Sequence, residues 1–155
     1  MDEGERAGLI ERYEQGPAEL EAAIEEVGDA GLDVRPSDGG WTPREIVHHC
    51  ADSEMTSAIR LRRLIAEDGP EIVGYDPDEF ATRLFYSERP IASSIEAVRA
   101  SRKTSAEILS RITGEQWSRT GTHSEGGDYG VELWLEIYSA HCHDHADQIR
   151  RAISG

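Results

Sequence analysis

The sequence lacks several features that mark particular classes of protein. No apolar run reaches the length needed to cross a membrane, and the acidic N-terminus, MDEGERAG, lacks the basic and apolar layout of a signal peptide. Two cysteines in 155 residues are too few for a disulfide framework. Because Cys50 and Cys142 both fall in expected helices, we expect buried free thiols and a cytoplasmic protein.

Lysine is almost absent, since Lys103 is the only one and arginine supplies the other basic residues. The formal net charge is −15. A surface this acidic repels nucleic acid and anionic membranes, so the sequence predicts neither as a partner and favours a small-molecule substrate. Either a high-salt cytoplasm or a GC-rich genome accounts for this composition.

Segments that alternate polar and apolar residues are also missing, so the sequence predicts no sheet. Helical periodicity instead predicts four long amphipathic helices, at residues 5–28, 43–67, 90–112 and 129–153. Gly16-Pro17 is a weak point in the first of them, which predicts a kink or two shorter helices. Four such helices in a chain of this length predict an all-α four-helix bundle, forming one domain over residues 1–155.

The clearest helix start is Thr42-Pro43-Arg44-Glu45, a capping box with proline at the first helical position. Long connections follow the second and third helices, at residues 68–89 and 113–128, so not all neighbouring helices are joined by simple hairpins. Within the first connection, Asp76-Pro77-Asp78-Glu79 predicts a short helix that runs to about Leu84. Four aromatic residues are expected to anchor this connection to the bundle: Tyr75, Phe80, Phe85 and Tyr86. The connection is either functional, or these residues only fix it in place.

The last expected helix carries two histidines on the face predicted to point inward. That face comprises Gly130, Trp134, Ile137, Tyr138, His141, His145, Gln148, Ile149 and Ala152, and the outer face Glu136, Ser139, His143, Asp147 and Arg150. Because His141 and His145 are four residues apart, their rings are neighbours that can bind one metal ion. A buried ring needs a partner, so two interpretations stay open: hydrogen-bonded core histidines, or metal ligands.

A third imidazole is available on the helix at residues 43–67. Helical phase places His49 at the edge of the apolar face, in line with Ser53 and Thr56, whereas His48 is predicted to be a solvated surface residue on the far side. Three imidazoles around one ion leave a position open for water or substrate, which is the arrangement of catalytic rather than structural sites.

Arg102 lies, with Ser105, in the middle of the apolar stripe of the helix at residues 90–112. A guanidinium there needs a carboxylate or an anionic group of a substrate, or else it extends to the rim of the bundle. These alternatives stay open. His123, in the second connection, has no geometric support as a metal ligand.

Two stretches of the chain resemble the motifs of the DinB/YfiT-like superfamily, and the likeness extends over nearly the whole chain. The stretch WTPREIVHHCADSE, at residues 41–54, resembles the first motif, in which a metal-binding histidine follows a tryptophan by eight residues; His49 has that place. The stretch HCHDHADQI, at residues 141–149, is similar to the second motif, H-x3-H-x2-Q-I. Tyr75-Asp76 resembles a dipeptide in the long connection of the YfiT-like branch. Cys50 and Asp144 depart from the residues that members often carry, without changing the ligand set.

This resemblance implies a four-helix bundle with an open divalent-metal site made by His49, His141 and His145. It implies a metal-dependent enzyme that activates a water or a low-molecular-weight thiol such as bacillithiol or mycothiol, as a hydrolase or a thiol S-transferase. Zn²⁺ or Ni²⁺ is the expected ion, with Fe²⁺ or Mn²⁺ as alternatives. Residues expected to support the ligands or contact the substrate are Asp52, Tyr75, Asp76, Arg102, Asp144 and Gln148.

Two other classes of function remain open. The sequence contains no recognisable acid–base dyad, which favours a non-catalytic metal-binding or stress-response bundle. A purely structural bundle with incidental histidines is the other alternative. The family resemblance also suggests a homodimer.

Overall fold

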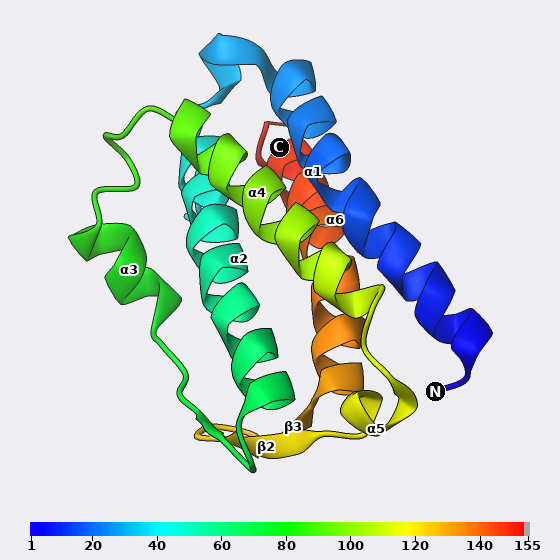
Figure 1. Cartoon of the computed structure of the whole chain (residues 1–155). Helices are drawn as coiled ribbons and strands as arrows, with labels where there is room; N and C mark the ends of the chain where they lie inside the picture. The colour runs from blue at the N-terminus through cyan, green and yellow to red at the C-terminus, as the bar shows by residue number, and fades with distance from the viewer. Residues whose placement is uncertain (154–155) are drawn as a thin grey trace.

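The computed structural model describes residues 1–153, and it confirms the predicted four-helix bundle (Figure 1). The long helices are α1 (Glu3–Gly31), α2 (Pro43–Ala66), α4 (Ala92–Leu109) and α6 (Val131–Ala152). Both α1 and α2 pack against α4 and α6, so α1 and α2 lie diagonally across the bundle. Two short helices, α3 (Pro77–Arg83) and α5 (Gly114–Trp117), lie in the connections. None of the helices within residues 1–153 is both long and apolar enough to cross a membrane.

The start of α2 is fixed locally, as the capping box predicts. The Thr42 hydroxyl accepts a hydrogen bond from the backbone N–H of Glu45 at 3.3 Å, and the Glu45 carboxylate accepts one from the N–H of Thr42 at 2.8 Å. Pro43 occupies the first helical position, where it has no hydrogen bond to lose. These contacts set the phase of α2 and therefore the direction in which His49 points.

The first helix bends at a different place from the one predicted. Gly16-Pro17 keeps helical dihedral angles, and the break lies at Gly28, where φ is 60° and ψ is 177°. Gly16 is buried, and a Cβ atom there would lie 2.2 Å from Nη1 of Arg102. The glycine therefore permits a close approach to α4, and the packing of α1 outweighs the weak helix propensity of the pair.

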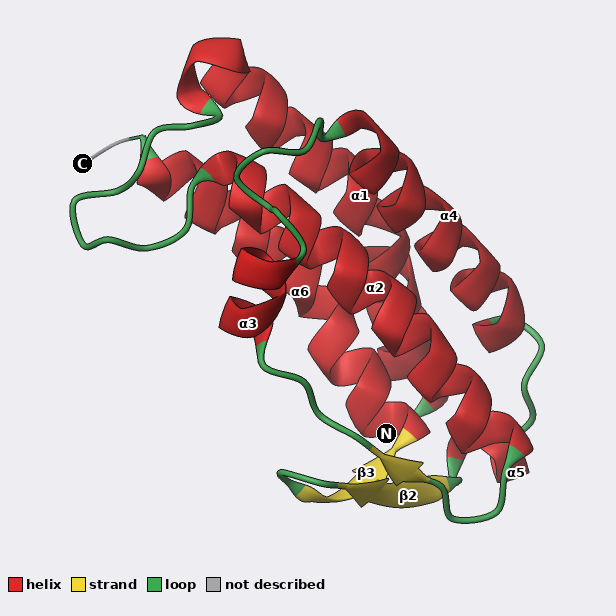
Figure 2. Ribbon diagram, turned by 90° about the vertical axis from the view of Figure 1, so that its left-hand side faces the viewer, coloured by secondary structure: helices red, strands yellow, loops and turns green. Residues whose placement is uncertain are grey.

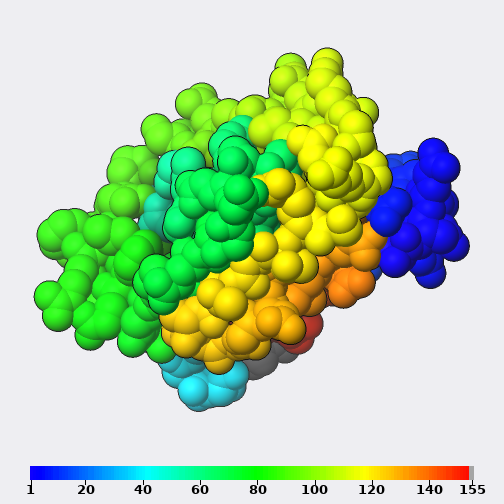
Figure 3. All heavy atoms as spheres, turned by 60° about the horizontal axis from the view of Figure 1, so that its bottom comes forward, coloured from blue at the N-terminus to red at the C-terminus, as the bar shows by residue number. Residues whose placement is uncertain are grey.

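A small three-stranded sheet closes one end of the bundle, so the prediction of no sheet was wrong (Figure 2). Strand β1 (Glu71–Ile72) runs parallel to β2 (Thr120–His123), which pairs antiparallel with β3 (Gly127–Gly130). Figure 3 shows the β2–β3 hairpin and the segment around β1 side by side at this end. Strands of two to four residues, several of them glycines, are too short to produce a detectable alternation.

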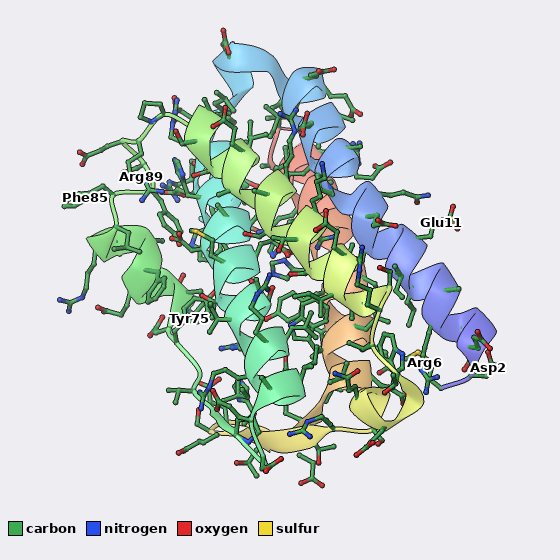
Figure 4. All side chains as sticks on the ribbon, viewed as in Figure 1. Asp2, Arg6, Glu11, Tyr75, Phe85 and Arg89 are labelled. Atoms are coloured by element: carbon green, nitrogen blue, oxygen red, sulfur yellow. The ribbon has the colours of Figure 1, made fainter. Side chains whose placement is uncertain are left out.

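The four aromatic residues of the connection between α2 and α4 differ in how they are held. Tyr86 is completely buried, whereas Phe85 is 60% exposed and points away from the bundle (Figure 4), so the predicted anchoring role of Phe85 was wrong. The rings of Tyr75 and Phe80 contact each other, with centroids 4.4 Å apart.

His48 is fully buried beneath this connection, contrary to the prediction of a solvated residue. Its Nδ1 lies 2.8 Å from the Ser94 hydroxyl, and its Nε2 lies 3.1 Å from the backbone carbonyl of Arg89. Both partners are about 40 or more residues away along the chain, so the periodicity of α2 alone could not show that this side of the helix is covered.

The core is divided into two apolar clusters with a polar layer between them. One cluster, near the sheet, includes Tyr13, Leu61, Leu64, Leu109 and Trp134; the other, at the opposite end, includes Leu20, Ile46, Cys50, Val98 and Ile149. On α2 and α4 the buried residues between the clusters include Glu54, Ser57, Arg102 and Ser105. The candidate site lies at the level of this layer.

The orientation of α6 differs from the predicted one. Ile137 is 42% exposed although it was assigned to the inner face, and Ser139 is 1% exposed although it was assigned to the outer face. The buried face is centred on Leu135, Tyr138 and Cys142, so His141 and His145 lie at its edge rather than its middle. This rotation leaves the two histidines within reach of solvent.

Candidate metal centre

Three histidines meet where α2 and α6 pack against each other. His49 comes from α2, and His141 and His145 come from adjacent turns of α6. One nitrogen from each ring can be chosen so that all three lie within 4.8 Å of one another. The ring centroids of His49 and His141 are 5.4 Å apart, those of His49 and His145 4.8 Å, and those of His141 and His145 4.5 Å. The structure thus brings together the three side chains that the sequence singled out.

Burial keeps these imidazoles neutral. It lowers the pKa of His49 to about 4, with a further decrease from the neighbouring His145. Burial also lowers the pKa of His141 well below its ordinary range, and that of His145 to a smaller extent. A neutral ring has a free lone pair, which is the form that binds metal ions.

Gln148 sets which nitrogen of His145 is free. The His145 Nδ1 atom lies 2.7 Å from the Gln148 side-chain oxygen, and an amide oxygen can only accept a hydrogen bond. Nδ1 therefore carries the proton, and Nε2 keeps its lone pair free to bind a metal ion. Gln148 lies one turn further along α6, so the orientation of this ring is built into the helix.

His141 is flanked by two residues of α2. Its Nδ1 faces a carboxylate oxygen of Glu54 at 3.8 Å, and its Nε2 lies 3.4 Å from the Ser53 hydroxyl. A carboxylate on the Nδ1 side favours the tautomer with the proton on Nδ1. The Nδ1 atoms of His49 and His141 are buried without a hydrogen-bond partner among the described residues.

Glu54 and Arg102 form a buried ion pair directly behind His141. Glu54 is fully buried and Arg102 is 1% exposed, with an N–O distance of 2.7 Å. Arg102 also donates to the backbone carbonyls of Tyr13 and Tyr138, at 2.6 and 2.8 Å. The carboxylate partner considered for Arg102 is thus present, and the alternatives of substrate contact and extension to the rim were wrong.

Trp41 packs against His49 and links it to the long connection. The two ring centroids are 4.8 Å apart. The Trp41 Nε1–H donates to a carboxylate oxygen of Asp78, on α3, at 3.1 Å. The position of α3 is therefore coupled to the surroundings of His49.

The remaining predicted residues lie at different distances from the histidine cluster. Asp52 accepts a hydrogen bond from the Tyr86 phenol at 2.5 Å, and Asp76 caps α3 by accepting from two backbone N–H groups. Both therefore stabilise the connection between α2 and α4 rather than the histidine cluster. Asp144 is exposed, next to His145 in the chain. Tyr75 is half-buried, between α3 and α2 (Figure 4), and its phenol hydrogen-bonds with Ser53, whose hydroxyl lies 3.4 Å from Nε2 of His141. Tyr75 is therefore near the cluster, as the sequence predicts for a residue that supports the site.

The sequence interpretation missed the contribution of Glu54. Its position four residues after Cys50 puts a carboxylate on the apolar face of α2, and that is the signal that could have revealed it. Cys50 and Cys142 are buried free thiols, as predicted. Cys142 is part of the same polar layer, because its Sγ lies 3.7 Å from the Glu54 carboxylate.

The fold and the histidine cluster together define the family. The sequence model of the DinB superfamily matches residues 12–149, and the chain belongs to that superfamily. This confirms the resemblance derived from the two motifs.

The relatives within this superfamily are similar over most of their length. The chain is 32% identical over 140 residues to a protein of Oceanobacillus iheyensis named "Putative metal-dependent hydrolase OB0782", covering 90% of this chain and 81% of that protein. It is 31% identical over 141 residues to "Putative metal-dependent hydrolase YfiT" of Bacillus subtilis, covering 90% of this chain and 79% of that protein. The solved structure of Bacillus subtilis YfiT superposes on this chain with a TM-score of 0.91 at 29% identity, covering 98% of this chain and 87% of that one. That protein is described as "a probable metal-dependent hydrolase with an unusual four-helix bundle topology".

Proposed function

We propose that this chain is a divalent-metal-dependent enzyme of the hydrolase type, in which His49, His141 and His145 bind the metal ion. The observation that carries the proposal is the cluster of three neutral imidazoles, contributed by two adjacent helices, with one nitrogen of each within 4.8 Å of the others. The names of the relatives support the hydrolase class. A small-molecule substrate and, from the family resemblance, a homodimer belong to the same proposal.

The donor set fits a divalent cation. The cluster offers one nitrogen from each of three imidazoles within 4.8 Å of one another, and Nδ1 of His49 is a buried atom with no hydrogen-bond partner in the described part of the chain. Imidazole suits Zn²⁺, Ni²⁺ and Fe²⁺, whereas Mn²⁺ prefers oxygen ligands. Because Fe²⁺ generally binds such sites less tightly than Ni²⁺ or Zn²⁺, we propose Zn²⁺ or Ni²⁺. Three protein ligands also leave room for a further molecule at the ion.

The surrounding residues orient the ligands. When bound, the cation would supply Lewis acidity to a water or a thiol. Gln148 and Glu54 face the Nδ1 atoms of the two histidines on α6 and so direct their Nε2 atoms toward a common point. The Ser53 hydroxyl, 3.4 Å from Nε2 of His141, can hydrogen-bond to a molecule held there.

A thiol S-transferase would use the same site, with a low-molecular-weight thiol in place of water. The test is a parallel assay of the Zn²⁺- or Ni²⁺-loaded protein with small esters and amides, and with bacillithiol or mycothiol plus an electrophile. Metal-dependent hydrolysis without thiol supports the hydrolase, and metal-dependent thiol consumption supports the transferase.

The same assay separates both enzymes from a non-catalytic metal protein. His49→Ala and His145→Ala are expected to abolish whichever activity is found, and a chelator should do the same. Full activity in these variants would contradict the proposal. Tight metal binding without turnover of any of these compounds would instead favour a metal-binding bundle.

A further inference from the structure

A cleft of about 360 Å³ lies between the β2–β3 hairpin and the first half of α6. Its walls include Arg60 from α2, Tyr138 from α6, and the half-exposed apolar side chains of Leu133 and Ile137. Figure 3 shows the end of the molecule where the hairpin lies. The arrangement described so far for the histidines does not use this cleft.

The cleft leads toward the histidine cluster. Leu133, Ile137 and His141 are spaced four residues apart, so their side chains follow one ridge of α6. Tyr138 connects the two regions as well, because its ring centroid lies 5.7 Å from that of His141. The lining of the cleft therefore reaches to within one helical turn of His141.

Arg60 brings a positive charge to the cleft and forms no direct ion pair among the described residues. Within residues 1–153, no carboxylate oxygen lies within 4.0 Å of its guanidinium nitrogens, although the chain contains 31 acidic residues. The guanidinium is held in place: Nη1 donates to the Tyr138 phenol at 3.2 Å, and Nη2 donates to the carbonyl of Val73 at 2.9 Å. It also lies 5.9 Å from the ring centroid of Tyr75.

This environment offers hydrogen-bond donors to an anion. A guanidinium has five N–H groups, and the contacts of Arg60 with Tyr138, Val73 and Tyr129 leave its Nε–H without a partner among the described residues. The phenol of Tyr138 accepts from Arg60, and the hydroxyls of Ser53 and Tyr129 also lie within hydrogen-bonding reach of it. A rigid guanidinium next to a phenol suits the planar geometry of a carboxylate.

Two acidic residues of the hairpin, Glu125 and Asp128, also line the cleft. The Glu125 carboxylate lies against Gly74, where a Cβ atom would be 2.5 Å from it. These negative charges oppose a phosphate dianion more strongly than a carboxylate monoanion. Of these two kinds of anion, the singly charged one is therefore opposed less at Arg60.

We propose that this cleft binds a small organic carboxylate, whose carboxylate group is held by Arg60 and Tyr138. The apolar part of that molecule packs against Leu133 and Ile137. The inference rests on the proposed function, because it identifies the substrate of the histidine site as a carboxylate-bearing molecule that extends along α6 to His141.

The test uses phenylacetate as the probe and phenylacetamide as its neutral counterpart. Each is titrated into the ¹⁵N-labelled full-length protein, with and without Zn²⁺, while the backbone amide signals are followed by NMR. The expected result is that phenylacetate shifts signals of Tyr129, Leu133 and Ile137 and binds more tightly than phenylacetamide. Equal affinity for the two probes, or shifts elsewhere on the molecule, would overturn the proposal.

Substitutions in the cleft sharpen this test. Arg60→Gln is expected to weaken phenylacetate binding about tenfold or more. Arg62→Gln is the matched control, because Arg62 lies on the side of α2 that faces α4, where it contacts Thr104 and Ser105, and should bind phenylacetate like the wild type. Unchanged binding in Arg60→Gln would contradict the proposal.

A second pair of variants covers the case in which loss of Arg60 perturbs the fold. Ile137→Glu places a negative charge in the cleft at a half-exposed position and should prevent phenylacetate binding. Ile59→Glu, at an exposed position outside the cleft, should not. If Ile137→Glu binds phenylacetate as the wild type does, the inference is wrong.

Metal binding by the same proteins separates this inference from the proposed function. Arg60→Gln should bind Zn²⁺ normally, and His49→Ala should lose Zn²⁺ but still bind phenylacetate in the cleft. If phenylacetate binding requires Zn²⁺ and is unchanged in Arg60→Gln, the probe binds only the metal ion. That result would overturn the inference but not the proposed metal site. Zn²⁺ failing to bind while phenylacetate occupies the cleft would overturn the proposed function instead.

Discussion

The carboxylate of Glu54 is fully buried, and it faces both the guanidinium of Arg102 and the ring of His141. The ion pair compensates the cost of burying each charge, and the same carboxylate helps to orient a proposed metal ligand. At the scale of single residues, stability and metal binding are therefore expected to change together here.

We predict that Glu54→Gln destabilises the protein by about 3 kcal/mol, because it leaves the buried guanidinium of Arg102 without a countercharge. Urea unfolding of the metal-free protein measures the change. Glu132→Gln, which removes a half-exposed partner of Arg6, is the matched control and should cost less than about 1 kcal/mol. Equal losses in the two variants would show that the buried pair has no special role.

Gln148→Ala should weaken metal binding by about 10–100-fold with little effect on folding, because His145 loses the acceptor that fixes its tautomer. Competition with a chromophoric chelator measures the affinity. Asp144→Asn, next to His145 but exposed, is the control and should retain nearly wild-type affinity. Similar losses in both variants would mean that the Gln148 contact does not orient the ring.

The depressed pKa of His49 predicts how stability depends on pH in the metal-free protein. Below pH 6.5 the unfolded His49 takes up a proton, whereas the folded one stays neutral until about pH 4. The unfolded state then binds more protons, so stability falls as the pH is lowered through this window. Compared with His49→Gln, the wild type should lose up to about 1.4 kcal/mol more per pH unit, as measured by urea unfolding from pH 7 to pH 4.5. Parallel curves for the two proteins would contradict this account.

At the scale of elements, α1 depends on one glycine. Gly16 has no side chain to interfere with Arg102, and an added Cβ would lie 2.2 Å from Nη1 of that residue and 2.9 Å from Cβ of Cys142. The requirement comes from neighbours on α4 and α6, and it overrides the preference of a helix for alanine.

Gly16→Ala is therefore expected to destabilise the protein by about 1–3 kcal/mol through overpacking. Gly8→Ala, in the same helix with nothing within 4 Å of the added Cβ, should stabilise it by about 0.5–1 kcal/mol. Thermal or urea unfolding compares the two variants directly. A stabilising effect of Gly16→Ala would show that the close approach of α1 to Arg102 is wrong.

The elements that could be predicted from the sequence are those with local signals. The start of α2 follows from the capping box at Thr42 and Glu45, and the spacing of His141 and His145 follows from the helical repeat. The burial of His48 and the strands of the small sheet depend on segments far away in the chain, so no local pattern shows them. The predicted orientation of α6 was wrong: Ile137 was assigned to the inner face and Ser139 to the outer face, and the structure shows the reverse. A single residue at the edge of a helix face contributes little to the periodicity, so the sequence did not reveal this error.

At the scale of the whole molecule, the polar layer explains where the site lies. It separates the two apolar clusters of the core, and the histidines occupy the same level at the junction of α2 and α6. The bundle therefore holds the rings from both sides while the edge position of His141 and His145 leaves them accessible. The meeting of the three histidines was predictable because each lies on a long helix. Glu54 and Arg102, which lie behind them, were recognisable as a pair only in three dimensions.

The most direct measurement of the central claim is the metal stoichiometry of the protein and of its single histidine variants. Elemental analysis after equilibration with Zn²⁺ should find about one ion per chain in the wild type and in the control His143→Ala. His49→Ala, His141→Ala and His145→Ala should each lose most of that metal. Full metal content in all three variants, or none in the wild type, would contradict the account.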